Sequence, residues 1–361
     1  MNRYTSLLFY GLFAFVAGCA GTGKNTGQAT DFFTADHPNI QYTGRIDFSN
    51  TKRPRFWSPG VYISARFKGP SCSFIIHDEI LWGNSHNYIE VIVDDKEPVR
   101  LQLKSKTDTV LAAAGLSKGE HTIVICKNTE SGIGYLEFGG FLCKELVAPA
   151  PKPSRKIEFI GNSITCGTGS DLSVKPCGTG QWYDQHNAYM SYGPVTARAL
   201  NAQWHLSAVS GIGMIHSCCN MTVTMSQVFD KINMRTDSIP WNFLQYTPDV
   251  VTICLGQNDG IQDSATFTHA YLRFIRQVRE RYPKAQIICL TSPMGNAGLT
   301  AVLKNYLDGI VNYATTHGDK KVSRYFFSRQ YHAGCDSHPD LKEHQQIAAG
   351  LTGYIRKLMS W

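Results

Sequence analysis

The sequence predicts an α/β protein in which an antiparallel β-sandwich precedes a domain with a parallel β-sheet and helices on both faces. Short runs of alternating apolar and polar residues fill the first part of the chain, whereas strand-like apolar runs alternate with helical patterns in the second. The length of 361 residues suits two folding units. With 43% hydrophobic and 17% charged residues, the composition excludes intrinsic disorder, collagen-like repeats and long coiled coils.

The N-terminal segment has the features of an export signal. Arg3 precedes an apolar run, Leu7 to Val16, which is shorter than the roughly 20 residues that span a bilayer. Small residues end directly before Cys19, an arrangement similar to the lipobox of bacterial lipoproteins. That resemblance implies a signal peptide over residues 1–18 and a lipid anchor on Cys19. The anchor would place the protein in the bacterial cell envelope, on the periplasmic side or the cell surface. Residues 19–36 would then form a flexible tether. The alternative is a plain secretory signal with an incidental cysteine.

Residues 37–147 are predicted to form the β-sandwich. Runs of alternating apolar and polar residues predict strands at 60–67, 72–76, 87–93 and 121–126. Turn-forming residues separate the runs: Lys68-Gly69-Pro70, Trp82-Gly83-Asn84, Asp94-Asp95 and Ser117-Lys118-Gly119. Closely spaced prolines in residues 148–155 then predict an extended linker.

Residues 156–361 are predicted to form the parallel-sheet domain. Five apolar runs predict its strands: 156–160, 204–209, 250–255, 286–290 and 322–327. The clearest helix follows a capping pair, Asp263-Ser264, and stops before Pro283, and a last helix begins near Pro339. Ligands bind such open sheets outside the carboxyl ends of the strands, so we expect the functional residues there.

Net charge and cysteine content bear on three features: binding of nucleic acid, disulfide pairing and metal binding. The net charge of +7 is dispersed along the chain without a basic stripe, so we expect no nucleic-acid partner. An exported chain permits disulfides among its eleven cysteines, but their pairing is not fixed by the sequence. Three cysteines inside apolar runs are expected to be buried and unpaired: Cys126, Cys254 and Cys289. Cys218 and Cys219 lie near His216, but no CxxC pair recurs at zinc-type spacing, so we predict no metal site.

Four strand ends carry residues suited to acyl transfer. Ser163 follows the first strand, Gly211 the second, Asn258 the third, and Asp336 with His338 the fifth. Ser163 and Asn258 each have an ordinary alternative role as a turn or capping residue. Together they supply a nucleophile, a base, a group to orient that base and donors for an oxyanion. The sequence has no Gly-x-Ser-x-Gly elbow, which argues against the α/β-hydrolase arrangement.

These four blocks, in this order, resemble those of the SGNH (GDSL-type) hydrolase superfamily. The resemblance implies a flavodoxin-like three-layer fold, with Ser163 as nucleophile and His338 as base. It implies an oxyanion hole formed by the Ser163 and Gly211 backbone N–H groups and the Asn258 amide, and Asp336 as the group that orients the base. The first block has Gly-Asn-Ser in place of Gly-Asp-Ser, and Asp336 precedes the histidine by two residues instead of three. A backbone carbonyl is therefore the alternative orienting group, which would leave a Ser-His dyad.

The pairing of a β-sandwich with this domain is similar to carbohydrate esterase family 2, whose members deacetylate plant polysaccharides. The resemblance implies a jelly-roll-like first domain, an acetylated polysaccharide or oligosaccharide as substrate, and no cofactor or metal. Trp182 and Tyr183, in the long insert after the first parallel strand, are candidates for stacking on sugar rings, and their alternative role is packing of the insert.

The expected activity is therefore that of a serine acetylesterase acting on a polysaccharide such as xylan or glucomannan through an acetyl-enzyme. One alternative is a lipase or a peptidoglycan O-acetylesterase with the same catalytic groups. Another is a glycan-binding lipoprotein without catalytic activity, in which the β-domain is the lectin.

Overall fold

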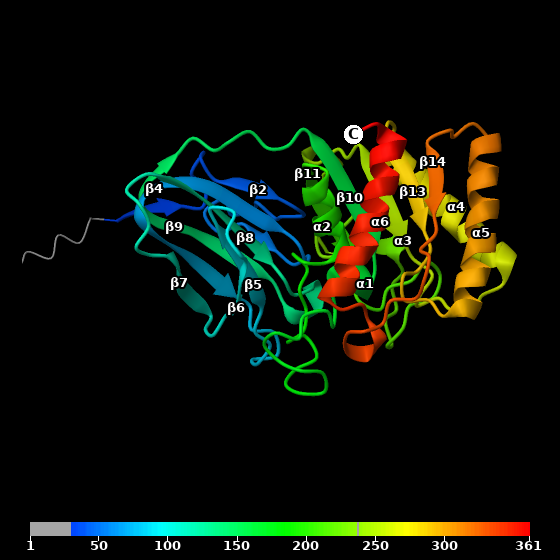
Figure 1. Cartoon of the computed structure of the whole chain (residues 1–361), viewed down its shortest axis with the longest axis horizontal. Coiled ribbons are helices and arrows are strands. Elements are labelled where there is room, and N and C mark those ends of the chain that lie inside the picture. Colours follow the sequence, from blue (N-terminus) through cyan, green and yellow to red (C-terminus); the bar gives the residue numbers. More distant parts are fainter. Residues whose placement is uncertain (1–29, 237) are drawn as a thin grey trace, which may run out of the picture.

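The computed structural model describes residues 30–236 and 238–361, and it contains two domains side by side (Figure 1). The predicted signal peptide and the lipidation site at Cys19 lie outside the described residues. No helix among the described residues is long and apolar enough to cross a membrane.

The first domain is an antiparallel sheet that curves around one apolar core. Its strands are β1 (Asp31–Thr34), β2 (Gln41–Thr43), β3 (Arg55–Phe56), β4 (Tyr62–Asp78), β5 (Tyr88–Val93), β6 (Val99–Gln102), β7 (Thr107–Ala113), β8 (Glu120–Lys127) and β9 (Leu136–Val147). The main order is β1-β9-β4-β8-β5-β6, with β2 and β7 paired to β4 and β3 to β9. Alternate residues of β4 are buried, as expected for strands with one face on a core. The predicted antiparallel β-domain is confirmed.

Two details of this domain differ from the prediction. The predicted tether ends earlier, because residues 31–34 form β1 and pair with β9. The turn predicted at residues 68–70 is wrong: this segment is a bulge inside the single long strand β4, and the register shifts between Lys68 and Cys72. Gly69 has a φ of +111° and Pro70 has no N–H to donate, so the strand bends there without ending.

The second domain has a five-stranded parallel sheet between two helical layers. Its strands are β10 (Arg155–Gly161), β11 (Ala202–Ala208), β12 (Val250–Cys254), β13 (Gln286–Leu290) and β14 (Val322–Tyr325). The order β11-β10-β12-β13-β14 is that of a flavodoxin-like doubly wound sheet. The helices are α1 (Ser163–Cys166), α2 (Tyr192–Ala199), α3 (Met225–Val228), α4 (Ser264–Arg281), α5 (Ala297–Thr316) and α6 (Leu341–Met359). Side chains of α3, α4 and α5 pack on one face of the sheet and those of α2 and α6 on the other. This confirms the predicted three-layer α/β domain.

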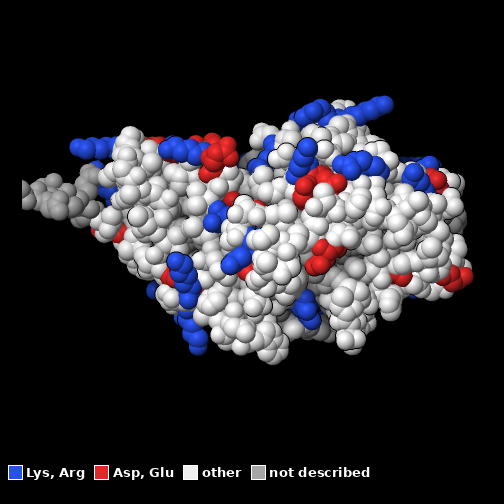
Figure 2. All heavy atoms as spheres, turned by 60° about the horizontal axis from the view of Figure 1, so that its bottom comes forward, with Lys and Arg blue, Asp and Glu red and all other residues white. Residues whose placement is uncertain are grey.

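Capping and proline residues in the sequence predicted two of the long helices, α4 and α6, correctly. The Asp263 carboxylate accepts the Thr266 backbone N–H at 2.8 Å and caps α4, and Asp340 caps α6 in the same way. Since the linker enters β10 at the upper edge in Figure 1, the carboxyl ends of the parallel strands lie at the lower edge. On the face shown in Figure 2, acidic and basic side chains are scattered and do not gather into a stripe.

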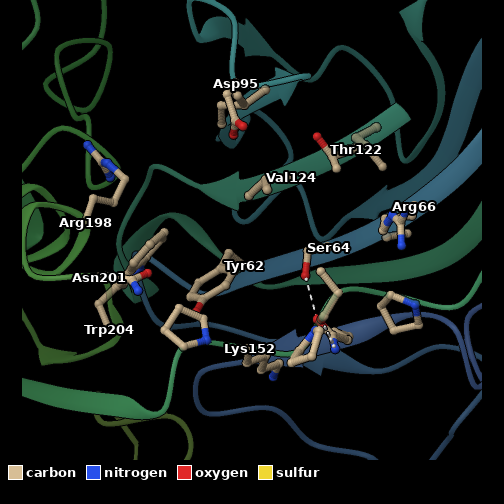
Figure 3. Close-up of a pocket in the computed structure, with 18 of the residues that line it drawn as sticks. Tyr62, Ser64, Arg66, Asp95, Thr122, Val124, Lys152, Arg198, Asn201 and Trp204 are labelled. Atoms are coloured by element: carbon tan, nitrogen blue, oxygen red, sulfur yellow. Dashed lines mark hydrogen bonds between the residues drawn. The ribbon is translucent and has the colours of Figure 1, made fainter. Parts of the chain in front are cut away.

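Aromatic side chains join the two domains. Trp204 of β11 donates its Nε1–H to the carbonyl of Gly60 at 2.9 Å, and its ring lies 4.0 Å from that of Tyr62. The Arg198 guanidinium lies 3.9 Å from the centre of the Tyr189 ring. These groups line one end of a cavity of about 410 Å³ between the domains, which the linker closes along one side (Figure 3). The ring faces are largely covered by one another and by Arg198, so these contacts fix the β-domain against the parallel sheet.

Candidate active site

Ser163 and His338 meet at the carboxyl ends of the parallel strands although 175 residues separate them in sequence. Ser163 is the first residue of α1, directly after β10, and the Asn162 side chain caps this helix by accepting the Ile164 N–H. His338 lies between a short 3-10 turn and α6. The Ser163 Oγ is 2.8 Å from His338 Nε2. The sequence therefore predicted both residues of this contact.

The tautomer of His338 follows from its other ring nitrogen. Nδ1 lies 3.2 Å from the carbonyl oxygen of Cys335, which only accepts hydrogen bonds. The proton of a neutral ring is therefore on Nδ1, and Nε2 is free to accept the Ser163 hydroxyl. Burial is the largest influence on the ring and lowers the pKa of His338 below 6.5. The imidazole is thus neutral and able to take a proton at neutral pH.

Asp336 does not hold the imidazole, which corrects its assignment as the orienting carboxylate. Its side chain is exposed and makes no hydrogen bond to the ring, and its backbone is left-handed at a φ of 51°. The alternative identified from the shortened spacing, a backbone carbonyl, is the arrangement present. The position of the Cys335 carbonyl is fixed on both sides of the residue. The Cys335 N–H donates to the carbonyl of Gly169 at 2.8 Å, and its sulfur is bonded to Cys177. The structure contains a Ser-His dyad supported by the Cys335 carbonyl.

The three groups predicted to form the oxyanion hole each have an N–H available as a donor. The backbone N–H groups of Ser163 and Gly211 have no hydrogen-bond partner within the described residues. The Asn258 amide donates one N–H to the carbonyl of Ile212 at 2.8 Å, which leaves its second N–H available. Gly211 has a φ of +84°, and a Cβ there would lie 3.0 Å from the sulfur of Cys218, so a residue with a side chain would be strained at this position. The predicted donors therefore have the hydrogen-bonding capacity that an oxyanion requires.

Two buried carboxylates that the sequence did not indicate hold the loop of residues 210–216, which contains Gly211. Asp259 accepts the backbone N–H groups of three residues at 2.7–3.0 Å: Met214, Ile215 and His216. Glu130, from the β-domain, accepts the N–H of Ser210 at 2.7 Å. In the sequence, the only indication that Asp259 has a role at the site was its position next to Asn258. No such indication existed for Glu130, because its contact with Ser210 joins two domains.

A cavity of about 490 Å³ adjoins this loop, and the two aromatic candidates differ in their relation to it. Trp182 is 51% exposed and lines the cavity together with Gly211 and Arg235. Tyr183 is only 3% exposed, and its hydroxyl donates to the carbonyl of Asn84. Tyr183 therefore packs the insert against the β-domain, its alternative role, and its assignment to substrate binding is wrong because its ring is not accessible.

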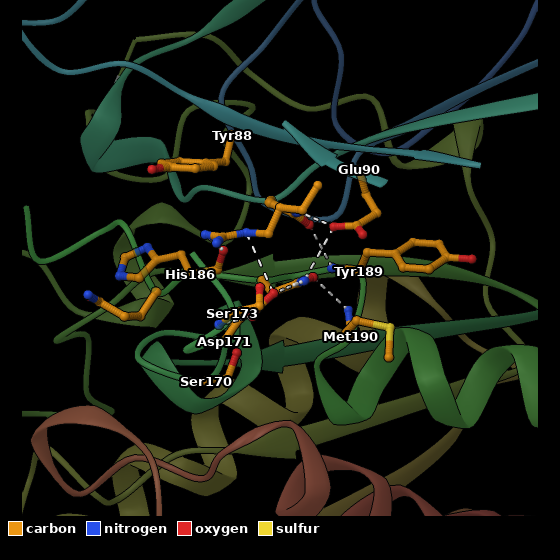
Figure 4. A network of polar contacts seen from close by, with 12 residues as sticks. Tyr88, Glu90, Ser170, Asp171, Ser173, His186, Tyr189 and Met190 are labelled. Carbon is orange, nitrogen blue, oxygen red and sulfur yellow. Dashed lines mark hydrogen bonds and ion pairs between the residues drawn. The ribbon is translucent and has the colours of Figure 1, made fainter. Parts of the chain in front are cut away.

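A buried polar network attaches the insert of residues 167–191 to the β-domain (Figure 4). The Arg100 guanidinium donates to the carbonyls of Asp184 and His186 at 2.7 and 2.8 Å. Asn187 donates to Asp171 at 2.8 Å and to Glu90 of β5 at 3.3 Å. The β-domain thus fixes the segment that carries Trp182.

Among the described residues, the cysteines form two disulfides, Cys177–Cys335 and the adjacent pair Cys218–Cys219. The three cysteines predicted to be buried and unpaired are so: Cys126, Cys254 and Cys289. Burial raises the pKa of their thiols, which makes them poor nucleophiles. In the described part of the chain, no group of three or more His, Cys, Asp and Glu side chains is arranged to hold a metal ion.

Comparisons with known proteins match both domains. Residues 42–153 match the family model "Carbohydrate esterase 2 N-terminal", and residues 159–325 match "GDSL-like Lipase/Acylhydrolase family". The chain is 30% identical over 358 residues to an "Acetylxylan esterase / glucomannan deacetylase" of Cellvibrio japonicus, with 96% of each chain covered. It is 34% identical over 340 residues to "Cellulase/esterase CelE" of Acetivibrio thermocellus, which covers 90% of this chain but 40% of CelE.

Solved structures agree with these matches. A family two carbohydrate esterase from Clostridium thermocellum, in complex with cellohexaose, has a TM-score of 0.81 at 33% identity, with 89% of this chain and 99% of that chain covered. A family two carbohydrate esterase from Cellvibrio japonicus has a TM-score of 0.83 at 27% identity, with 92% and 99% covered. The likeness extends over both domains.

Proposed function

Because this chain belongs to carbohydrate esterase family 2, we propose that it removes O-acetyl groups from a polysaccharide such as xylan or glucomannan. The observation that carries the proposal is the 2.8 Å contact between Ser163 and a neutral His338, beside a loop with an unoccupied backbone N–H at Gly211. The relatives named above supply the substrate class. The face that carries the strand ends has few charged side chains, which suits a neutral polysaccharide (Figure 2).

Acyl transfer begins at the dyad. As Ser163 Oγ forms a bond to the acetyl carbon, its proton moves to His338 Nε2 and the carbonyl electrons move onto the oxygen. The Ser163 and Gly211 N–H groups and the Asn258 amide stabilise that oxyanion. The Nδ1–H of the new imidazolium donates to the Cys335 carbonyl, so the cation is stabilised without contact to a carboxylate.

Breakdown of the first intermediate gives the acetyl-enzyme. The bond between the acetyl carbon and the sugar oxygen breaks, and that oxygen takes the proton from His338. A water molecule then loses a proton to His338 and attacks the acetyl carbon. The bond between that carbon and Ser163 Oγ breaks, Oγ takes the proton back from His338, and acetic acid is released. Each proton has a stated donor and acceptor among these groups, so the cycle needs no cofactor.

The polysaccharide is expected to bind in the cavity next to the 210–216 loop. Trp182 exposes half of its surface there, and an indole face suits the apolar face of a sugar ring. The polar network and the disulfide Cys177–Cys335 hold the segments on either side of Trp182, so the ring is presented from an ordered insert.

The test is acetate release from acetylated xylan, acetylated glucomannan and O-acetylated peptidoglycan, with aryl acetate and aryl octanoate compared in parallel. We expect release from one or both plant polysaccharides, preference for the acetyl ester, and loss of activity in Ser163→Ala. Preference for the octanoyl ester would favour a lipase, and release from peptidoglycan alone a peptidoglycan O-acetylesterase. Glycan binding by the full chain without turnover would favour the non-catalytic alternative.

We also propose that the protein is anchored to the bacterial envelope by lipid on Cys19. The proposal rests on the apolar run from Leu7 to Val16 and the small residues before the cysteine. Expression in a bacterium should place the unmodified chain in the membrane fraction and Cys19→Ser in a soluble fraction. An unchanged distribution would contradict the lipid anchor.

A further inference from the structure

We propose that Glu130 of the β-domain is a positioning residue for the oxyanion donor Gly211, so that the β-domain completes the active site. The inference rests on the proposed esterase function. Ser210, whose N–H is bound by Glu130, directly precedes Gly211 in the chain. A constraint on Ser210 is therefore a constraint on the peptide group that carries the Gly211 N–H.

The contact between the two domains is buried and well directed. The Glu130 side chain is fully buried, and its Oε2 accepts the Ser210 N–H at 2.7 Å, a length typical of a charge-assisted hydrogen bond. The Ser210 hydroxyl lies 2.9 Å from that of Thr168. Ser210 is thus held through its backbone by one domain and through its side chain by the other.

The turn that presents Glu130 is itself fixed. Lys127 ends β8, and its buried ammonium group donates to the carbonyls of Thr129 and Glu130 at 2.7 and 3.2 Å. The backbone carbonyl of Asn128 accepts the N–H of Ala188, in the insert of the second domain, at 3.2 Å. Because hydrogen bonds hold this turn at both ends, the Glu130 carboxylate has a fixed position.

The 210–216 loop is consequently held at both ends by carboxylates from different domains. Glu130 binds the N–H at its start, and Asp259 of the second domain binds the N–H groups of its last three residues. The negative charge of Glu130 does not itself favour a reaction that develops an oxyanion nearby. Arg235 lies 3.5 Å from the other Glu130 oxygen and offsets the charge of the carboxylate. The useful property of Glu130 is therefore its reach to Ser210 and not its charge.

Two substitutions separate reach from charge. Glu130→Gln keeps the length and an acceptor oxygen but loses the charge, whereas Glu130→Asp keeps the charge and is one methylene too short. With an aryl acetate, we expect Glu130→Asp to lower kcat about 10- to 100-fold, because small misplacements of catalytic groups cost up to about 100-fold. KM should change less than about threefold, since only transition-state stabilisation is affected. Glu130→Gln should stay within about fivefold of the unmodified chain.

The control variant is Glu137→Gln, another buried carboxylate of the β-domain, which pairs with Arg53 and Arg55. Its kcat should match that of the unmodified chain even if its melting temperature falls. A lowered kcat in Glu130→Gln with a normal Glu130→Asp would overturn the inference, and so would normal kcat in both.

A second readout does not depend on turnover. Hydrogen exchange of the peptide that contains Ser210 should be faster in Glu130→Asp than in the unmodified chain, because the N–H loses its acceptor. Unchanged exchange would overturn the inference. An unmodified chain without any esterase activity would contradict the proposed function instead, so the two failures are distinguishable.

Discussion

Substitution of Asp336 distinguishes a dyad from a triad. Asn is the suitable replacement because it keeps the side-chain volume and tolerates the left-handed backbone at a φ of 51°. The exposed carboxylate makes no hydrogen bond to the imidazole, and the Cys335 carbonyl at 3.2 Å remains in place. Asp336→Asn therefore removes only a through-space interaction with His338.

The size of that interaction sets the expected effect. Solvent-exposed charges contribute at most about 1 kcal/mol, which corresponds to about fivefold in rate. Loss of a carboxylate that holds a catalytic histidine costs about 10⁴-fold in kcat. We therefore expect kcat/KM of Asp336→Asn to lie within about fivefold of the unmodified chain, far from the value for a triad.

The assay is the initial rate of aryl acetate hydrolysis over a range of pH. The Asp336 charge raises the pKa of His338, so its removal should lower that pKa and move the acid limb of the profile to lower pH. Asp95→Asn is the matched control, since Asp95 is also exposed and left-handed, at a φ of 53°, but lies in a turn of the β-domain. A decrease of about 1000-fold or more in Asp336→Asn, with a normal control, would refute the dyad.

Three further outcomes follow from the same geometry. Asn258→Ala should lower kcat about 10²- to 10³-fold through loss of one oxyanion donor, and steady-state rates within about threefold of normal would contradict that role. The acid limb of kcat/KM should have its midpoint below pH 6.5, because burial lowers the pKa of the His338 base; a midpoint above 7 would contradict this account. Burial also lowers the pKa of His205 to about 4 and of His344 to about 3. Below pH 6.5 the unfolded state therefore binds more protons than the folded state. The melting temperature should consequently fall as the pH is lowered from 6.5 towards 4, and a constant value over that range would contradict the assignment of both rings as buried and neutral.

Local sequence patterns were sufficient for the five strands of the second domain and for two of its helices. Apolar runs marked all five parallel strands, and β12 and β13 are buried along nearly their whole length, as expected for strands covered on both faces. The order of the strands placed Ser163 and His338 at the same sheet edge, since the carboxyl ends of parallel strands lie together. Two strands lie between β10 and β14, so the 2.8 Å contact also requires the chain after β14 to return across the sheet, where Cys335 is hydrogen-bonded to Gly169 and disulfide-bonded to Cys177.

Features that depend on contacts distant in sequence were not predictable in this way. Trp182 and Tyr183 are neighbours in an irregular insert, where no periodicity shows which ring faces the solvent. The bulge at Gly69 has the composition of a turn, and only its pairing with β9 on both sides shows that the strand continues. Glu130 lies 80 residues before its partner Ser210 and in another domain, so nothing in its own surroundings indicated a role at the site.

The most direct test of the central claim is identification of the acetylated residue. The chain is mixed with an aryl acetate, quenched with acid during steady turnover and digested, and the peptides are compared by mass spectrometry with those of Ser163→Ala. We expect one acetyl group on the peptide containing Ser163, none on the corresponding peptide of the variant, and no acetate release by the variant. An acetyl group on another residue, or undiminished acetate release by Ser163→Ala, would show that this hydroxyl is not the nucleophile.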